Sequence, residues 1–275
     1  MSVPKPSGLK SLGQPEEGIS EDMSSRNHLN GLERGLAVMR AFTELRDQVT
    51  VAEMARAVDL PRATVRRCLL TLNTLGYIEV TGRYFRLTPQ VLTLAQAYLS
   101  SSLLPRVSQA FLEQVSDTLN ESCSVSILNG DSVIYVARST RKRAASVHRD
   151  VGTHLPAYCS SMGRVLLASL PDAELDAYFA RVVMKKFTPK TIVDETELRK
   201  RLDKVRASGY CVIDGELEHD LRAIAVPLYN SSGTVVAALH AISSEPGRGS
   251  ISKMEKTFLP VLRHAVAQIR VLLIG

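Results

Sequence analysis

The sequence contains no tryptophan, and aromatic residues make up only 5% of its 275 residues. Hydrophobic residues still reach 45%, a usual share for a globular protein, so aliphatic side chains must fill the core. Apolar stretches such as 165–170 are much shorter than the ~20 residues that span a bilayer. The first residues contain no apolar segment of the kind found in secretory signals. We therefore expect neither a membrane span nor a secretory signal.

Cysteine is also scarce. The four cysteines, Cys68, Cys123, Cys159 and Cys211, are widely spaced and form no Cys-x-x-Cys pair. This spacing argues against a zinc ribbon and against a disulfide scaffold, and it favours a reducing, cytoplasmic compartment. At roughly 100–200 residues per domain, the length predicts one large or two modest domains.

Lysine is absent from one part of the chain. Residues 29–104 contain nine arginines, six acidic residues and no lysine, and five of the arginines fall within 62–86. Guanidinium groups bind phosphates and guanine edges in a bidentate manner, so this composition favours contact with nucleic acid. The alternative is a solvated basic face that binds nothing.

Three helices are expected after a flexible tail, residues 1–27, that has little apolar periodicity. Apolar residues recur at helical spacing over 32–45. Thr50 and Glu53 form a capping box that begins a second helix, which ends near residue 57. After a turn that ends at Pro61, a third, basic helix is expected over 62–75, and Gly76 closes it. This order is typical of a helix-turn-helix, whose second helix lies in the major groove of DNA.

A hairpin follows the basic helix. Residues 77–80 and 83–87 have the composition of two short strands joined by a turn, and a basic hairpin at this place is typical of a wing. The alternative is a three-helix scaffold with a hairpin that binds no nucleic acid. The residues predicted to contact double-stranded operator DNA are Thr50, Arg62, Thr64, Arg66, Arg67, Thr71, Arg83 and Arg86.

The remaining chain divides into a linker and a second domain. Residues 89–104 read as a helix that is apolar on more than one face, which favours packing against a second copy of the chain. Residues 105–275 mix strand hairpins with separate helices, which predicts an α+β domain with an antiparallel sheet. The expected organisation is a tail at 1–27, a winged helix-turn-helix domain at 28–88, a linker helix at 89–104 and an effector-binding domain at 105–275.

This arrangement resembles the IclR family of bacterial transcriptional regulators over about residues 32–274. The resemblance rests on the basic helix, 60–69, on Leu-Pro-Ala-Tyr-Cys-Ser-Ser-Met-Gly-Arg-Val-Leu-Leu-Ala at 155–168, and on 214–217 and 221–227. The sequence of residues 156–164 is most similar to that of the family members that regulate protocatechuate, p-hydroxybenzoate and β-ketoadipate catabolism. One departure is clear: His219 and Asp220 stand where the family has Gly before Leu-Arg.

The resemblance implies a winged-helix DNA-binding domain, a GAF-like effector domain, a homodimer that can pair into a tetramer, and a small organic acid as effector. For this chain the acid would be β-ketoadipate, protocatechuate or p-hydroxybenzoate. A regulator of another carbon-source pathway is the alternative. No cofactor, metal or membrane partner is expected.

The predicted effector site centres on Ser160 and Ser161 at the start of a helix. Their hydroxyls and the free amides of the first turn would bind a carboxylate, aided by the helix dipole; ordinary helix capping is the alternative. His240 lies within an apolar strand, either facing the ligand or bonded within the core. The residues predicted to bind the effector are Arg138, Tyr158, Ser160, Ser161, Met162, Arg164, Asp214, Arg222 and His240.

Candidate residues exist for two other classes of function, an enzyme and a redox-sensing regulator. A thiol enzyme would pair Cys159 with His148 or His154, but no third activating group is visible. A metal site at 214–220, which holds Asp214, Glu216, Glu218, His219 and Asp220, lacks the spacing of known sites. Catalysis is therefore not expected. A redox-sensing regulator stays open as an alternative because Cys159 lies at a helix N-terminus, where a thiolate is favoured.

Overall fold

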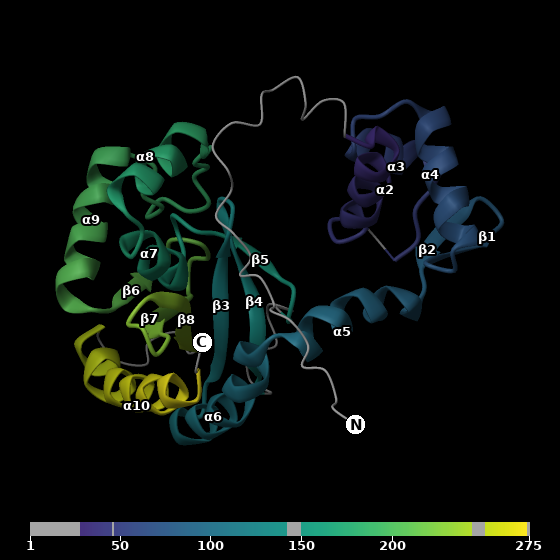
Figure 1. The fold of residues 1–275 in the computed structure, drawn as a ribbon. Helices are drawn as coiled ribbons and strands as arrows, with labels where there is room; N and C mark the ends of the chain where they lie inside the picture. The colour runs from purple at the N-terminus through teal and green to yellow at the C-terminus, as the bar shows by residue number, and fades with distance from the viewer. Residues whose placement is uncertain (1–27, 46, 142–149, 244–250, 274–275) are drawn as a thin grey trace, which may run out of the picture. The chain divides into compact units, whose positions relative to one another are not determined.

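The computed structural model describes residues 28–45, 47–141, 150–243 and 251–273. The chain divides into two compact units, Met1–Ala95 and Gln96–Gly275 (Figure 1). The division falls inside helix α5 (Leu92–Ser101), which lies within the expected linker. The expected tail at 1–27 lies outside the described residues.

The first unit contains three helices and a hairpin: α2 (Asn30–Ala41), α3 (Val51–Ala57), α4 (Arg62–Thr74), β1 (Ile78–Thr81) and β2 (Tyr84–Leu87). Strand β1 pairs with β2 in antiparallel register, and Val49 adds a bridge to Phe85. A short 3-10 helix, η1 (Pro89–Val91), leads into α5. The core is aliphatic, as the composition requires, and includes Val38, Met54, Val65, Leu69 and Ile78.

Local sequence signals explain the boundaries of these helices. The Thr50 side chain accepts a hydrogen bond from the Glu53 amide, and the Glu53 carboxylate accepts one from the Thr50 amide at 2.8 Å. Helix α4 begins one residue after Pro61, because proline fixes φ and has no amide to donate. Gly76, at φ +81°, takes the left-handed conformation that ends the helix.

The second unit is built on one antiparallel sheet of six strands in the order β5-β4-β3-β8-β7-β6. The strands are β3 (Ser122–Asn129), β4 (Ser132–Ser139), β5 (His154–Pro156), β6 (Cys211–Asp214), β7 (Arg222–Tyr229) and β8 (Val235–Ser243). Strand β5 is short, and its sequence has no alternating pattern. The helices are α6 (Leu103–Leu119), α7 (Ser161–Ala168), α8 (Asp172–Arg181), α9 (Glu195–Ser208) and α10 (Ile251–Leu272).

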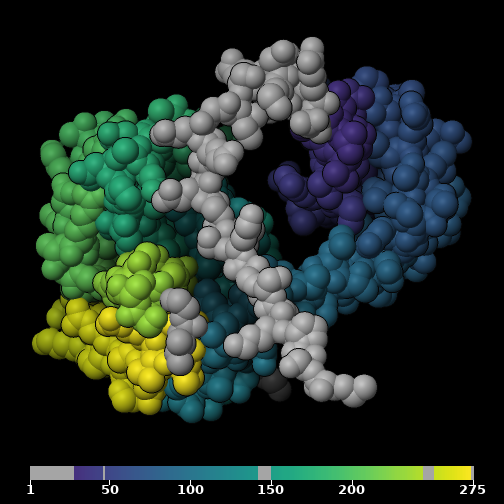
Figure 2. Space-filling view, in the orientation of Figure 1, coloured from purple at the N-terminus to yellow at the C-terminus, as the bar shows by residue number. Residues whose placement is uncertain are grey.

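The two faces of this sheet are covered by different helices (Figure 1). Helices α6 and α10 pack on one face, and α7, backed by α8 and α9, packs on the other. In the space-filling view, α9 and α10 form part of the visible surface of the unit (Figure 2). Since side chains alternate between the faces of a strand, every second residue of β3 and β8 points toward α7. This face holds the candidate cavity.

Candidate nucleic-acid interface and buried cavity

Helix α4 has one buried face and one exposed face. Val65, Leu69 and Leu72 are buried in the core of the first unit. At 100° per residue, Ala63, Arg66, Arg67, Leu70 and Thr74 lie on the opposite side, and all are exposed. The exposed face thus presents two guanidinium groups beside small and apolar side chains. It can offer hydrogen bonds to guanine edges and apolar contact to thymine methyl groups.

The structure separates the predicted DNA contacts on this helix. Arg62, Arg66 and Arg67 are exposed. Thr64 is half-buried and lines a groove between α2 and α4, away from the centre of the exposed face. Thr71 lines the same groove, and its hydroxyl donates to the Arg67 carbonyl at 2.9 Å. Thr50 acts as the cap of α3. Ala63 and Leu70 share the exposed face with the arginines; the helical period places both there, although neither has a charge that marks it in the sequence.

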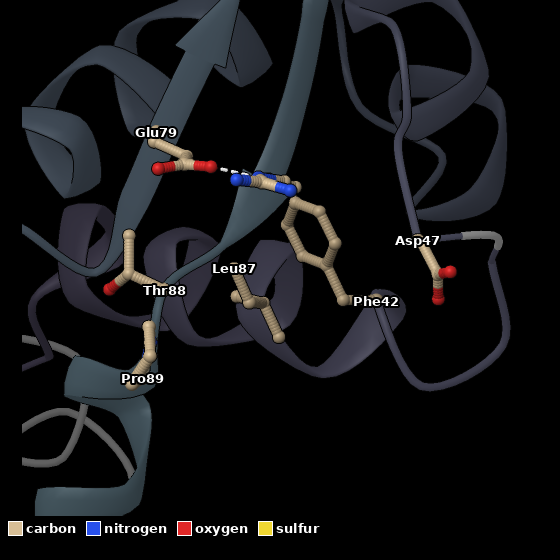
Figure 3. Close-up of a pocket in the computed structure, with 7 residues that line it drawn as sticks. Phe42, Asp47, Glu79, Leu87, Thr88 and Pro89 are labelled. Atoms are coloured by element: carbon tan, nitrogen blue, oxygen red, sulfur yellow. Dashed lines mark hydrogen bonds and ion pairs between the residues drawn. The ribbon is translucent and has the colours of Figure 1, made fainter.

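In the wing, the two predicted arginines differ. Arg83 is exposed at the turn, donates to the Tyr84 hydroxyl at 3.0 Å and lies over its ring; this hydrogen bond raises the pKa of Arg83. Arg86 instead forms a cross-strand ion pair with Glu79. Figure 3 shows the Glu79 carboxylate in this pair above a shallow pocket that Phe42 also lines. The expectation that Arg86 offers a free charge to DNA therefore needs correction.

An apolar groove of about 570 Å³ lies between α2 and α4, beside the exposed face of α4. Leu32, Leu36, Leu75 and Leu94 line it, and the exposed fraction of each is between 40% and 62%. Helix α5 has no buried residue, and its Leu92 is 68% exposed. This much uncovered aliphatic surface is unusual for a monomeric protein.

In the second unit, helix α7 begins against the sheet. The Ser160 hydroxyl accepts a hydrogen bond from the Gly163 amide at 3.2 Å and so caps the helix. The Ser161 hydroxyl is buried and has no hydrogen-bond partner among the described residues. Both serines line a small cavity between α7 and the sheet, in which the centre of a water molecule can reach only about 10 Å³. Its other walls are Leu155, Met162, Ile213, Leu217, Leu221, Ala223, His240 and Ile242.

A row of polar side chains crosses the sheet toward this cavity. Arg138 lies opposite Ser124, and Ser124 lies opposite His240. The His240 ring is fully buried and lies 5.4 Å from the Tyr135 ring, centroid to centroid. Residues three positions apart in a regular strand point to opposite faces, but a β-bulge in β4 puts both Tyr135 and Arg138 on this face. Ser124, Ser126 and Tyr135 were not among the predicted residues; the alternation of serines at 122, 124 and 126 was the available signal.

Arg164 was predicted to bind the effector, but it is buried and does not line the cavity. Its guanidinium forms a bidentate ion pair with Glu216, with nitrogen–oxygen distances of 2.7 and 2.5 Å, and both residues are buried. The predicted charge at the effector is thus already neutralised by a carboxylate.

Three more predicted effector residues form hydrogen bonds to other parts of the protein: Asp214, Arg222 and Tyr158. The Asp214 carboxylate accepts hydrogen bonds from Arg222 at 2.6 Å and from Lys190 at 2.9 Å, and these bonds lower the pKa of Asp214. The Tyr158 hydroxyl donates to the Lys185 carbonyl and accepts from the Lys185 amide, both at 2.7 Å. None of the three lines the cavity. His219 and Asp220, the departure from the family pattern, are exposed and do not line it either.

The thiol alternatives lose support from the burial of Cys159. Its side chain is fully buried, and burial raises its pKa to about 12, so the thiol is protonated at neutral pH and is a poor nucleophile and redox sensor. Within the described ranges, no group of three or more His, Cys, Asp or Glu side chains is placed to hold a metal ion. No helix of the described chain has the length and apolarity needed to cross a bilayer.

Comparison with known families matches both units. The model of the IclR helix-turn-helix domain matches residues 31–82, and the model of the bacterial transcriptional regulator IclR C-terminal domain matches residues 96–271. The chain is 44% identical to the Pca regulon regulatory protein of Pseudomonas putida, covering 91% of this chain and 86% of that one. It is 35% identical to the p-hydroxybenzoate hydroxylase transcriptional activator of Acinetobacter baylyi, covering 91% and 94%.

Solved structures agree with this. A transcriptional regulator from Rhodococcus sp. RHA1 is 45% identical with a TM-score of 0.77, covering 90% of this chain and 98% of that one. An IclR homologue from Microbacterium hydrocarbonoxydans in complex with 4-hydroxybenzoate is 27% identical with a TM-score of 0.73, covering 88% and 98%. The relatives are transcriptional regulators rather than enzymes.

Proposed function

Since the chain belongs to the IclR family and is a DNA-binding regulator of the Pca and Pob type, we propose that it controls genes for the catabolism of aromatic acids in response to a small carboxylate. The carboxylate binds in the cavity beneath the first turn of α7. The observation that carries this assignment is a group of buried hydroxyls between α7 and the sheet that have no hydrogen-bond partner among the described residues.

Three serines make up this group: Ser161 lines the cavity, and Ser124 and Ser126 lie outside its lining on the neighbouring strand β3, where Ser124 is opposite His240. Each hydroxyl is buried with no hydrogen-bond partner among the described residues. Native proteins satisfy nearly all buried polar groups, and each exception costs about 1–3 kcal/mol. A ligand with polar atoms would remove this cost, which supports ligand binding between α7 and the sheet face that carries Ser124 and Ser126.

The helix end supplies the preference for an anion. The Ser160 hydroxyl already caps the Gly163 amide, but the amides of Ser161 and Met162 lack a partner four residues earlier in α7, and the helix dipole favours negative charge there. A carboxylate at Ser160 and Ser161 would lie across the cavity from His240. Arg138 adds a positive charge to the same polar row. Oxygen atoms at the other end of the ligand would face Ser124 and Ser126 on β3.

The cavity must widen to accept such a ligand. The centre of a water molecule can move through only about 10 Å³ of it, which is about the space that one water needs. An aromatic acid is larger, so binding requires Leu217 or Leu221 to move away from α7. This requirement gives the effector a way to favour one conformation over another, because only differential affinity can shift an equilibrium.

Thermal unfolding with added acids tests the effector site. The acids are p-hydroxybenzoate, protocatechuate and β-ketoadipate, each added alone to the full chain. A bound acid at 100 times its dissociation constant adds about 2.7 kcal/mol of stability. Ser161→Ala should bind the acid about tenfold more weakly, while the ligand-free variant stays as stable as the parent or more so, since it loses an unpaired hydroxyl.

Ser169→Ala, at the other end of α7, is the matched control. Its hydroxyl donates to the Val165 carbonyl and lies outside the cavity lining, so acid binding should not change. Absence of a shift with every acid would contradict the assignment of the cavity.

The apolar groove of the first unit supports a dimer. A second copy that covers Leu92 and Leu94 would bury this aliphatic surface, and paired DNA-binding units match paired half-sites on DNA. Sedimentation of Leu92→Lys/Leu94→Lys should show a shift toward monomer. Val183→Lys is the control, because Val183 is 77% exposed in the second unit and its replacement should leave the assembly unchanged. A double variant that sediments like the parent would contradict this interface.

A further inference from the structure

The Arg164–Glu216 ion pair lies beside the cavity and joins its two sides. Arg164 comes from α7, and Glu216 comes from the connection between β6 and β7, residues 215–221. The side chains are 3% and 10% exposed. The first turn of α7 supplies Ser160 and Ser161 to the cavity, and the connection supplies Leu217 and Leu221. One ion pair therefore links the segment that supplies Ser160 and Ser161 to the segment that supplies Leu217 and Leu221.

Each partner also holds backbone. The Arg164 Nε donates to the Tyr158 carbonyl at 2.8 Å, just before the start of α7. The Ile192 amide donates to a Glu216 carboxylate oxygen at 3.4 Å. The pair thus ties α7 to the 215–221 connection and to the segment between α8 and α9.

Two threonines of the α8–α9 segment complete the attachment of the connection. The Thr188 hydroxyl donates to the Gly215 carbonyl at 2.7 Å, and the Thr191 hydroxyl donates to the Glu216 carbonyl at 2.6 Å. These bonds fix the start of the connection, at 215 and 216. Leu217 and Leu221, which line the cavity, follow directly.

We propose that Arg164 and Glu216 are a positioning pair for effector binding, an inference that rests on the effector site proposed above. The pair holds Leu217 and Leu221 over the first turn of α7 in one geometry, without touching the ligand. A buried ion pair is a weak source of net stability compared with apolar side chains of the same volume. A bidentate arginine–carboxylate pair does fix orientation, because its two parallel bonds form in one arrangement only. The pair therefore contributes geometry to the cavity.

Amide hydrogen exchange of the ligand-free full chain tests the positioning directly. In Arg164→Met/Glu216→Met both charges are removed together, so no unpaired charge stays buried and the fold persists. Amides of residues 217–221 should exchange at least tenfold faster than in the parent, while amides of β3 and α10 keep their rates. Unchanged exchange at 217–221 would overturn the proposal, whatever the effector turns out to be.

Ligand affinity supplies the second arm. The double variant should bind p-hydroxybenzoate, protocatechuate or β-ketoadipate, whichever the parent binds, at least tenfold more weakly, with DNA affinity in the absence of acid within twofold of the parent. The control is Arg201→Met/Glu197→Met, which removes an exposed ion pair on α9 and should change neither value. Parent-like acid affinity in the buried double variant would overturn the proposal. If the parent binds none of the acids, the effector assignment fails, and the exchange experiment still decides the positioning role.

Discussion

The two units place arginine in opposite surroundings. In the first unit, Arg66 and Arg67 are exposed on α4, and among the described residues neither forms an ion pair. In the second, Arg164 is 3% exposed and paired with Glu216. An exposed arginine costs the fold little and is available to DNA phosphates and base edges. The buried Arg164 instead uses its charge to bind Glu216, and this pair fixes the position of α7 relative to the 215–221 connection. Position relative to the core thus decides what an arginine does here.

The largest effect should follow from breaking the buried pair on one side only. Glu216→Ala leaves the Arg164 charge buried without its carboxylate, and loss of one partner of a buried pair costs about 3–5 kcal/mol. Denaturant unfolding of the full chain would measure this loss. Arg66→Ala, on the exposed face of α4, should change stability by less than about 0.5 kcal/mol. Equal losses in the two variants would remove the contrast between the units.

Two helical glycines give a second contrast. A Cβ at Gly163 of α7 would lie 2.2 Å from the Ala157 carbonyl oxygen, whereas a Cβ at Gly35 of α2 would meet no atom within 4 Å. Gly163→Ala should therefore destabilise the chain by about 1–3 kcal/mol through overpacking. Gly35→Ala should stabilise it by about 0.5–1 kcal/mol, because alanine loses less backbone entropy in a helix. Thermal unfolding of both variants decides this, and a stabilising Gly163→Ala would contradict the close packing of α7.

DNA affinity should separate the arginines of the first unit. Arg66→Ala or Arg67→Ala should weaken operator binding by about 1–3 kcal/mol if the side chain contacts a base edge. Arg86→Ala should cost less, because Glu79 already pairs with that guanidinium. Fluorescence anisotropy with operator DNA at fixed salt would measure the three affinities. A larger loss for Arg86→Ala than for both α4 variants would place the wing, not α4, at the centre of recognition.

Much of the first unit was predictable because its signals are local. The capping box of Thr50 and Glu53, the break at Pro61 and the left-handed Gly76 each act within four residues. The helical period then places the arginines of α4 outside the core. The ion pair between Arg86 and Glu79 was not predicted, because it depends on the register of two strands.

The cavity of the second unit depends on contacts far apart in sequence. The start of α7 at Ser161 was predictable from its cap and the resemblance. The partner of Arg164 was not, since Glu216 lies 52 residues away. The bulge that brings Tyr135 and Arg138 onto one face reverses what simple alternation predicts for residues three apart. Sequence patterns therefore located the helix end at which we propose that an anion binds, and packing decided which side chains face it.

The smallest expected effect concerns the half-exposed pair at the edge of the cavity-bearing unit. Hydrogen bonds lower the pKa of Asp214, with the larger effect from Arg222 and the smaller one from Lys190. A lowered folded-state pKa adds stability above the unfolded value, ~3.9, and this stability is lost as the pH falls through the folded-state pKa. Asp214→Asn should therefore lose at most about 1 kcal/mol at pH 7, since solvent screens the pair, and the difference from the parent should vanish in stronger acid. Denaturant unfolding between pH 7 and pH 3 would measure both. A difference that grows as the pH falls would show that Asp214 is stabilised by something other than its ionised pair, and would weaken the distinction between edge charges and the buried Arg164–Glu216 pair.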